Sequence, residues 1–312
     1  MTLDLPLVSV IIPVFNGEKT ISETIKSVLE QTLSDFELIV INDGSQDSTL
    51  DILTNIHDSR LKVFSYKNAG VSASRNRGVS HSSGEFIAFL DTDDLWTTDK
   101  LEAQLKALKA HPQAAVAYSW TDHIDEFGQF LSPACHLTVN GDVYARLLTG
   151  NFLTNGSNAL IRAQALTEIG GFDESLTHAE DWDMWLKLAA RYHFVAVPYP
   201  QILYRKSTNS ASCNVSRMEA ASLRVIERAY SQAADSLQHL KKETLGFLYK
   251  SLIYKALEGP PGQRKGLKAA NLLWRYIIND CSRHRLVRFK LSLLSKVMAT
   301  MLLPSHQPQL DW

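Results

Sequence analysis

The sequence is poor in features that mark several large classes of protein. It has only three cysteines in 312 residues (Cys135, Cys213 and Cys281), scattered along the chain, so neither a disulfide framework nor a cysteine-rich zinc site is expected. No apolar run reaches the roughly 18–20 residues that a membrane-spanning helix needs. The first residues also lack the basic and then apolar pattern of a signal peptide. We therefore expect a cytoplasmic protein with reduced thiols.

The sequence also lacks an excess of charge of either sign. Its net charge is −1, so no global field that would attract nucleic acid is evident, and no nucleic-acid partner is expected. The charges are nevertheless unevenly distributed, because residues 1–215 carry −10 and residues 216–312 carry +9. With 45% hydrophobic residues, the chain can bury a substantial core. The two parts are thus expected to do different jobs.

Short apolar runs alternate with helical periodicity over the first 120 residues, a pattern typical of βαβ units and a mainly parallel sheet. Between the first two strands, Ile21, Ile25, Val28 and Leu29 recur on one helical face. Ser45 and Asp47 are candidate N-caps of the next helix. The strands are expected at 7–13, 36–42, 61–66, 85–90 and 114–120, then at 157–162, 193–197 and 202–206.

The rest of the chain divides into an irregular region and a helical tail. Residues 121–150 lose periodicity, which predicts a connecting or substrate-shaping loop region, and a helix is expected over 182–192. After about residue 215, roughly four amphipathic helices are predicted, so the domains are expected at 1–215 and 216–312. The basic, amphipathic segment 283–303 suits either contact with an anionic membrane or packing on the preceding helices.

An acidic cluster follows a predicted buried strand in the sequence FLDTDDLW (89–96). Asp91, Asp93 and Asp94 would repel one another at the carboxyl end of a strand, where α/β proteins bind ligands. A cation would stabilise them, and oxygen ligands favour Mg²⁺ or Mn²⁺ over zinc. The alternative is an acidic start of the next helix.

Further polar turns follow other predicted strands. Asp43 lies in the turn INDGSQDST (41–49), next to the end of the first strand in PVFNGE (13–18). The segment NAGVSASRNRG (68–78) carries Arg75 and Arg77, which suit a phosphate-bearing ligand or an ordinary charged surface. A pocket built from adjacent strand ends is therefore expected.

A third candidate site is the segment GGFDESLTHAEDWDMWLKLA (170–189). Glu180 and Asp181 precede a helix whose Trp182 and Trp185 are expected to pack in the core. Asp181 is a candidate general base, and the alternative is that it simply caps the helix.

Taken together, these segments resemble family-2 inverting glycosyltransferases with a GT-A fold. The similarity covers about residues 7–206, two thirds of the chain, and the tail lies outside it. It rests on motifs in a fixed order: VSVIIPVFNGEKTISETIKSVLEQT, FELIVINDGSQDST, NAGVSASRNRG, GEFIAFLDTDD, GGFDE and AEDWDMWLKLA.

The resemblance implies a role for each matching residue. Pro13, Glu18 and Arg75 would border the nucleotide, and Asp43 would bind its base, usually uracil. Asp91 and Asp93 match the DxD motif: Asp91 would touch the ribose and Asp93 would hold the metal. Asp181 matches the catalytic base. Arg205 in ILYRKSTNS (202–210) loosely matches a residue that closes over the donor phosphates; Lys206 and an exposed basic strand end are the alternatives.

The implied reaction moves a sugar from a nucleoside diphosphate, usually UDP, to a hydroxyl acceptor with inversion of configuration. Mn²⁺ or Mg²⁺ would be the cofactor, and the acceptor would be a glycan or glycolipid of the cell surface. Two alternatives stay open. One is a non-catalytic scaffold that binds a nucleotide or sugar, and the other is a sugar nucleotidyltransferase, although PVFNGEKT lacks the Gly- and Arg-rich phosphate loop of that class.

Overall fold

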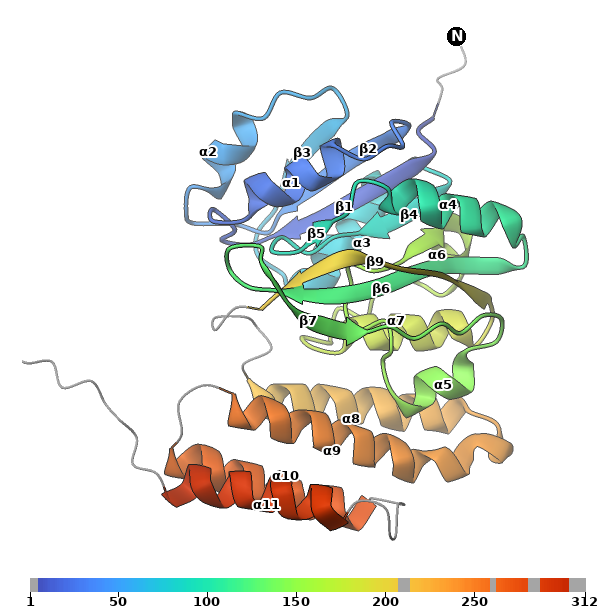
Figure 1. Ribbon diagram of the computed structural model, residues 1–312. Helices are drawn as coiled ribbons and strands as arrows, with labels where there is room; N and C mark the ends of the chain where they lie inside the picture. The colour runs from blue at the N-terminus through green and yellow to red at the C-terminus, as the bar shows by residue number, and fades with distance from the viewer. Residues whose placement is uncertain (1–4, 207–213, 259–261, 280–286, 303–312) are drawn as a thin grey trace, which may run out of the picture. The chain divides into compact units, whose positions relative to one another are not determined.

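The computed structural model describes residues 5–206, 214–258, 262–279 and 287–302 (Figure 1). The chain forms two compact units, one of residues 1–147 and 151–207 and the other of residues 148–150 and 208–312. The domain boundary expected at residue 215 stays a prediction. No helix in the described ranges is both long and apolar enough to cross a membrane.

The larger unit alternates strands and helices from its first strand onward. Its elements are β1 (Val8–Val14), α1 (Ile21–Leu29), β2 (Phe36–Asn42), α2 (Thr49–Thr54), β3 (Leu61–Ser65), α3 (Val71–His81), β4 (Phe86–Phe89), β5 (Leu95–Trp96), α4 (Lys100–Ala110), β6 (Ala114–Ile124), β7 (Phe130–Cys135), α5 (Tyr144–Thr149), β8 (Leu160–Arg162), α6 (Ala163–Glu168), α7 (Glu180–Ala189) and β9 (His193–Arg205). The last residues of α5 belong to the other unit.

The strands that the structure describes form one sheet in the order β3-β2-β1-β4-β8-β6-β9-β5, with β7 paired to β6. The β3-β2-β1-β4 part is wholly parallel, as the alternating pattern predicts. Beyond it, β8 runs antiparallel to β4 and β6, whereas β9 is parallel to β6. The carboxyl ends of β1, β2 and β4 therefore lie at one edge of the sheet, where α/β proteins bind ligands.

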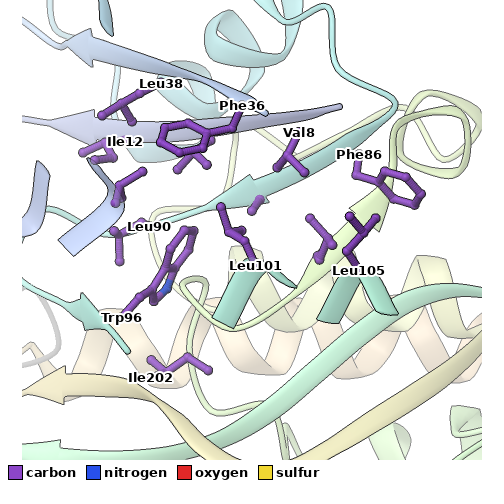
Figure 2. Packing of buried hydrophobic residues seen from close by; sticks show 14 of the residues in the cluster. Val8, Ile12, Phe36, Leu38, Phe86, Leu90, Trp96, Leu101, Leu105 and Ile202 are labelled. Carbon is purple, nitrogen blue, oxygen red and sulfur yellow. The ribbon is translucent and has the colours of Figure 1, made fainter. Parts of the chain in front are cut away.

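The central parallel strands β1, β2 and β4 are buried at every residue, whereas the edge strand β3 is partly exposed. Val8, Ile12, Phe36 and Leu38 belong to the same buried cluster as Leu101 and Leu105 of α4, and α1 and α2 contribute to it as well (Figure 2). Helix α3 packs against β1. A Cβ at Gly78 would stand 2.3 Å from Ile11 Cγ2, so a glycine is needed for this close approach.

The structure corrects several local expectations. The irregular region predicted at 121–150 is in part a β-hairpin, because β6 continues to Ile124 and pairs with β7. Its periodicity was obscured by register shifts in the pairing and by the exposed side chains of β7. The N-cap of α2 is Ser48, and not Ser45 or Asp47. The two strands expected at 193–197 and 202–206 are one strand, β9.

The smaller unit is helical, as predicted. It contains α8 (Val215–Gln232), a short 3₁₀ helix η2 (Asp235–Leu240), α9 (Lys241–Leu257), α10 (Gln263–Asn279) and α11 (Val287–Leu302). The predicted breaks near residues 234, 259–262 and 280 fall between these elements. Part of the segment 283–303 lies outside the described residues.

Candidate active site

Three strand ends are joined by hydrogen bonds at the polar edge of the sheet. The backbone N–H of Asp43, just after β2, donates to the carbonyl of Val14 at the end of β1 (2.8 Å). The Thr92 hydroxyl, in the turn after β4, donates to the carbonyl of Pro13 (2.5 Å). The turns that the sequence identified separately are therefore neighbours, and Pro13 is buried between them.

Asp43 organises the turn that leads into α3. Its side chain is buried and accepts hydrogen bonds from the backbone N–H groups of Ala69 (2.9 Å) and Gly70 (2.8 Å). Arg77, on α3, forms an ion pair with the same carboxylate (3.2 Å). The exposed-surface interpretation of Arg77 is therefore incomplete, because this arginine neutralises Asp43.

Glu18 lies at the exposed rim of the same edge. Its carboxylate accepts a hydrogen bond from the N–H of Ser48 (3.0 Å), and its own N–H donates to Asp47 (3.1 Å). Nearby, Asn16 has a φ of 52°, a left-handed conformation that is uncommon for a residue other than glycine. The turn after β1 is thus fastened to the turn after β2.

Arg75 is a deeply buried cation of the site, with 2% of its side chain exposed. Its guanidinium pairs with Asp91 (2.5 Å) and with Glu180 at the start of α7 (3.0 Å). Burial would lower the pKa of Arg75, but the charges of Asp91 and Glu180 outweigh it and raise the pKa above its ordinary value. A Cβ at Gly156 would lie 2.6 Å from Arg75 Nη2, so the glycine makes room for the guanidinium.

The three aspartates after β4 have different surroundings. Asp94 is fully buried and accepts hydrogen bonds from the Ser157 hydroxyl (2.6 Å) and the N–H of Arg205 (3.1 Å). Burial and then the charge of Asp93 raise the pKa of Asp94 well above its usual range. Asp94 thus stabilises the turn through its hydrogen bonds. Asp91 and Asp93 are only partly buried.

Asp93 is the carboxylate that suits a metal ion. Burial and then the charge of Asp91 raise its pKa to about 6, and no other residue in the described ranges donates a hydrogen bond to its carboxylate. An oxygen donor of this kind fits Mg²⁺ or Mn²⁺. Within those ranges, no group of three His, Cys, Asp or Glu side chains forms a ligand set. A metal held by Asp93 would therefore need further ligands from a substrate or water.

Arg205 is buried, and each nitrogen of its guanidinium is bound to the protein. Nε donates to the carbonyl of Asp93 (2.9 Å), Nη1 donates to the carbonyl of Glu126 (2.8 Å), and Nη2 pairs with Glu23 (2.7 Å). Arg205 thereby ties the β6–β7 hairpin to the acidic turn. Its contact with donor phosphates stays a prediction.

Asp181 lies in the first turn of α7, after Ala179, which has a φ of 58°. Its carboxylate accepts hydrogen bonds from the Asn151 side chain (2.9 Å) and the N–H of Trp182 (2.7 Å). Burial and then the charge of Glu180 raise the pKa of Asp181 to about 7, although Arg75 and both hydrogen bonds oppose the shift. A carboxyl group with this pKa can exchange a proton near neutral pH.

Sequence reasoning missed residues that interact with these carboxylates through hydrogen bonds or charge. Asn151 lies just beyond the weakly periodic region, and only its hydrogen bond to Asp181 shows that it belongs to the site. The pKa of the Tyr204 hydroxyl is raised by burial and then by the charges of Asp94, Asp93, Asp91 and Asp181. Its place in β9, one residue before Arg205, was the only available signal. Glu180 was identified, but its ion pair with Arg75 was not.

Comparison with known proteins identifies the family. The model of the family described as glycosyltransferase like family 2 matches residues 9–257. The chain belongs to this family.

Relatives in the family differ in how much of their length the chain covers. A protein of Rickettsia bellii named as an uncharacterized glycosyltransferase is 27% identical over 282 residues, which are 88% of this chain and 40% of that protein. The Escherichia coli enzyme WfgD, named as a UDP-Glc:α-D-GlcNAc-diphosphoundecaprenol β-1,3-glucosyltransferase, is 32% identical over 67% of this chain and 80% of its own. The chain thus spans less than half of some relatives.

Solved structures confirm the expected GT-A type of fold. Staphylococcus aureus TarS, solved as residues 1–349 with UDP-GlcNAc, superposes with a TM-score of 0.66 at 20% identity over 94% of this chain and 89% of that one. The mannosyltransferase PcManGT of Pyrobaculum calidifontis, solved with GDP-Man and Mn²⁺, gives a TM-score of 0.60 at 18% identity over 96% and 86%. At these identities the likeness establishes the fold alone.

Proposed function

We propose that this chain transfers a sugar from a nucleoside diphosphate, a UDP-sugar in the first instance, to a hydroxyl group of an acceptor, with inversion at the anomeric carbon. The observation that carries the proposal is Asp181, a carboxyl whose pKa is about 7, connected through Glu180 and Arg75 to Asp91 of the DxD turn. A base and a donor-binding turn are thereby held together.

The donor is assigned to the edge formed by β1, β2 and β4. Pro13, Glu18 and Asp43 line the nucleotide end, and Asp91 is assigned to the ribose. Arg75 holds Asp91 in place, because its guanidinium is buried and paired with that carboxylate. The UDP and UDP-GlcNAc complexes of TarS and the GDP-Man complex of PcManGT support a nucleotide donor.

Asp181 is assigned as the catalytic base. It accepts the proton of the acceptor hydroxyl while that oxygen bonds to the anomeric carbon. The bond from this carbon to the donor phosphate breaks on the opposite face, and the nucleoside diphosphate leaves with the electron pair. A single displacement of this kind inverts the configuration and needs no covalent intermediate.

Asp93 is assigned to hold Mn²⁺ or Mg²⁺ together with the donor diphosphate. When bound, the cation stabilises the negative charge that develops on the leaving diphosphate. Arg205 keeps the turn in place, because it binds the backbone carbonyl of Asp93. The Mn²⁺ that accompanies GDP-Man in the PcManGT complex supports this assignment.

The acceptor is assigned to a cell-surface glycan or glycolipid. WfgD, by its name, glucosylates a lipid-linked sugar, and a chondroitin synthase of Escherichia coli is 30% identical over 68% of this chain. A cytoplasmic location fits such an acceptor, and so would contact of segment 283–303 with an anionic membrane. The oligomeric state is left open.

The proposal is tested by incubating the chain with a panel of UDP- and GDP-sugars, Mn²⁺ and either free or lipid-linked acceptor sugars. We expect release of the nucleoside diphosphate that depends on the acceptor, and a β-linked product from an α-linked donor. Binding of the nucleotide without transfer to any acceptor would favour the scaffold alternative. Release of pyrophosphate from a nucleoside triphosphate and a sugar phosphate would favour a nucleotidyltransferase.

A further inference from the structure

The last two helices of the smaller unit, α10 and α11, form an antiparallel pair. They run side by side (Figure 1), and a Cβ at Gly266, near the start of α10, would lie 2.8 Å from Met301 Cα, near the end of α11. Contact this close between two backbones requires glycine. The pair is therefore a defined packing unit with outward faces of its own.

One outward face of α10 is apolar although no described residue covers it. Leu267, Trp274 and Ile278 recur at spacings of i, i+7 and i+11, so they form one stripe along the helix. They are 54%, 65% and 53% exposed, respectively. The inward face is made by other residues, namely Gly266, Ala269, Leu272, Leu273 and Tyr276. The stripe is thus available to a partner.

The second helix has an exposed apolar stripe as well. Leu291, Leu294 and Met298 of α11 recur at i, i+3 and i+7 and are 46–58% exposed, whereas Leu293 and Val297 are buried. Exposed apolar groups gathered in this way mark an interaction surface more often than isolated ones do.

The charges of the two helices identify the chemistry of the partner. Residues 263–279 and 287–302 contain seven Lys and Arg residues and no Asp or Glu, and one of the seven, Arg275, forms an ion pair with Glu219 of α8. A pair of helices with this excess of positive charge repels a second copy of itself and attracts an anionic surface. Among anionic surfaces, a membrane accepts apolar side chains too, and a tryptophan suits the boundary between headgroups and acyl chains.

We infer that the α10–α11 pair docks on an anionic lipid surface, with Trp274 and its stripe entering the boundary between headgroups and acyl chains. Arg264 and Lys268 of α10 lie against the headgroups. This assigns the contact to α10 as well as to α11, which is the described part of the basic segment that the sequence analysis identified. The inference does not require the transfer reaction, and its test contains no donor sugar.

The test measures co-sedimentation of the whole chain with phosphatidylcholine vesicles that do or do not contain phosphatidylglycerol. We expect binding to the anionic vesicles, weaker binding in high salt, and little binding to phosphatidylcholine alone. The double variant Trp274→Ala/Ile278→Ala should bind the anionic vesicles about tenfold more weakly, because it removes the largest apolar groups of the stripe.

A matched control is Tyr199→Ala in the larger unit, because Tyr199 is exposed to the same 65% as Trp274. This variant should bind vesicles as the unaltered chain does, and both variants should keep the thermal melting profile. A second pair of substitutions, Arg264→Gln/Lys268→Gln, should weaken binding and reduce its salt dependence.

Two results would overturn the inference. One is the absence of binding to anionic vesicles at low salt. The other is vesicle binding that is the same in the Trp274→Ala/Ile278→Ala variant as in the unaltered chain. If that variant also loses self-association, measured by light scattering, the stripe binds a second copy of the chain and not a membrane.

Discussion

The two acidic turns of the candidate active site hold their carboxylates in different ways. Asp91, after β4, faces a buried arginine that neutralises it. Asp181, at the start of α7, makes no ion pair with that arginine and is held instead by hydrogen bonds from Asn151 and Trp182. Burial and then the charge of Glu180 raise the pKa of Asp181 to about 7, so this carboxyl can take up a proton near neutral pH. The turn that carries Asp91 therefore suits binding, and the turn that carries Asp181 suits proton transfer.

The largest change in the binding turn is expected from Asp93→Ala. It removes the only carboxylate assigned to the metal, so Mn²⁺ should no longer strengthen UDP binding, and turnover should fall by about 10³ or more. Isothermal titration with UDP, with and without Mn²⁺, checks this. Asp51→Ala, an exposed aspartate on α2, is the control and should change neither quantity. An unaltered Mn²⁺ effect in Asp93→Ala would remove the metal from this turn.

Arg75→Met tests whether one buried cation serves both turns. The substitution leaves Asp91 and Glu180 without their partner, so the free energy of unfolding should fall by about 3–5 kcal/mol. Arg77→Met, which affects a more exposed ion pair, should cost about 1 kcal/mol. Denaturant unfolding compares the two variants. Equal losses would mean that Arg75 is an ordinary ion-pair residue, and partial recovery in Arg75→Met/Glu180→Gln would support the shared role.

The pH dependence of turnover should report the Asp181 carboxyl. Since the base acts when deprotonated, turnover should rise about tenfold per pH unit below pH 7 and level off above it. The same group binds its proton more tightly in the folded chain than in the unfolded one, so its contribution to stability declines as pH rises from about 4 to about 7. A turnover profile that is flat between pH 5 and 8 would contradict the assignment.

A smaller effect is expected from Asn151→Ala. The Asn151 amide stabilises the charged form of Asp181, so its loss should raise the pKa of the base and lower turnover about tenfold at neutral pH. Asn151→Asp should move the acid limb of the pH profile further upward, because it places a second carboxylate against the base. Similar profiles for both variants would reduce Asn151 to a packing role.

Much of the fold could be read from the sequence. The strand expected at 36–42 matches β2 residue for residue, because it is buried on both faces and reads as a continuous apolar run. The helix α3 was not identified, since its sequence VSASRNRGVSH is polar and it packs through small residues such as Gly78. The sequence does not predict the β6–β7 hairpin, because β7 is largely exposed and lacks an apolar run.

The site was predictable in its positions and less so in its interactions. The predicted strand ends placed Asp43 and Asp91 at one edge of the sheet, whereas Asp181 was predicted only as the start of a helix. The burial of Arg75 between Asp91 and Glu180 depends on residues 16 and 105 positions away, which no local pattern encodes. Asn151 likewise contacts a residue 30 positions away. Pairings of this kind are set by packing.

The central claim is that Asp181 accepts the acceptor's proton, and Asp181→Asn tests it most directly. The asparagine keeps the size of the side chain and removes its basicity. Acceptor-dependent release of the nucleoside diphosphate should fall by about 10³ or more, while the affinity for UDP with Mn²⁺ stays within about twofold of the unaltered chain. Turnover close to that of the unaltered chain, with UDP binding intact, would contradict the account.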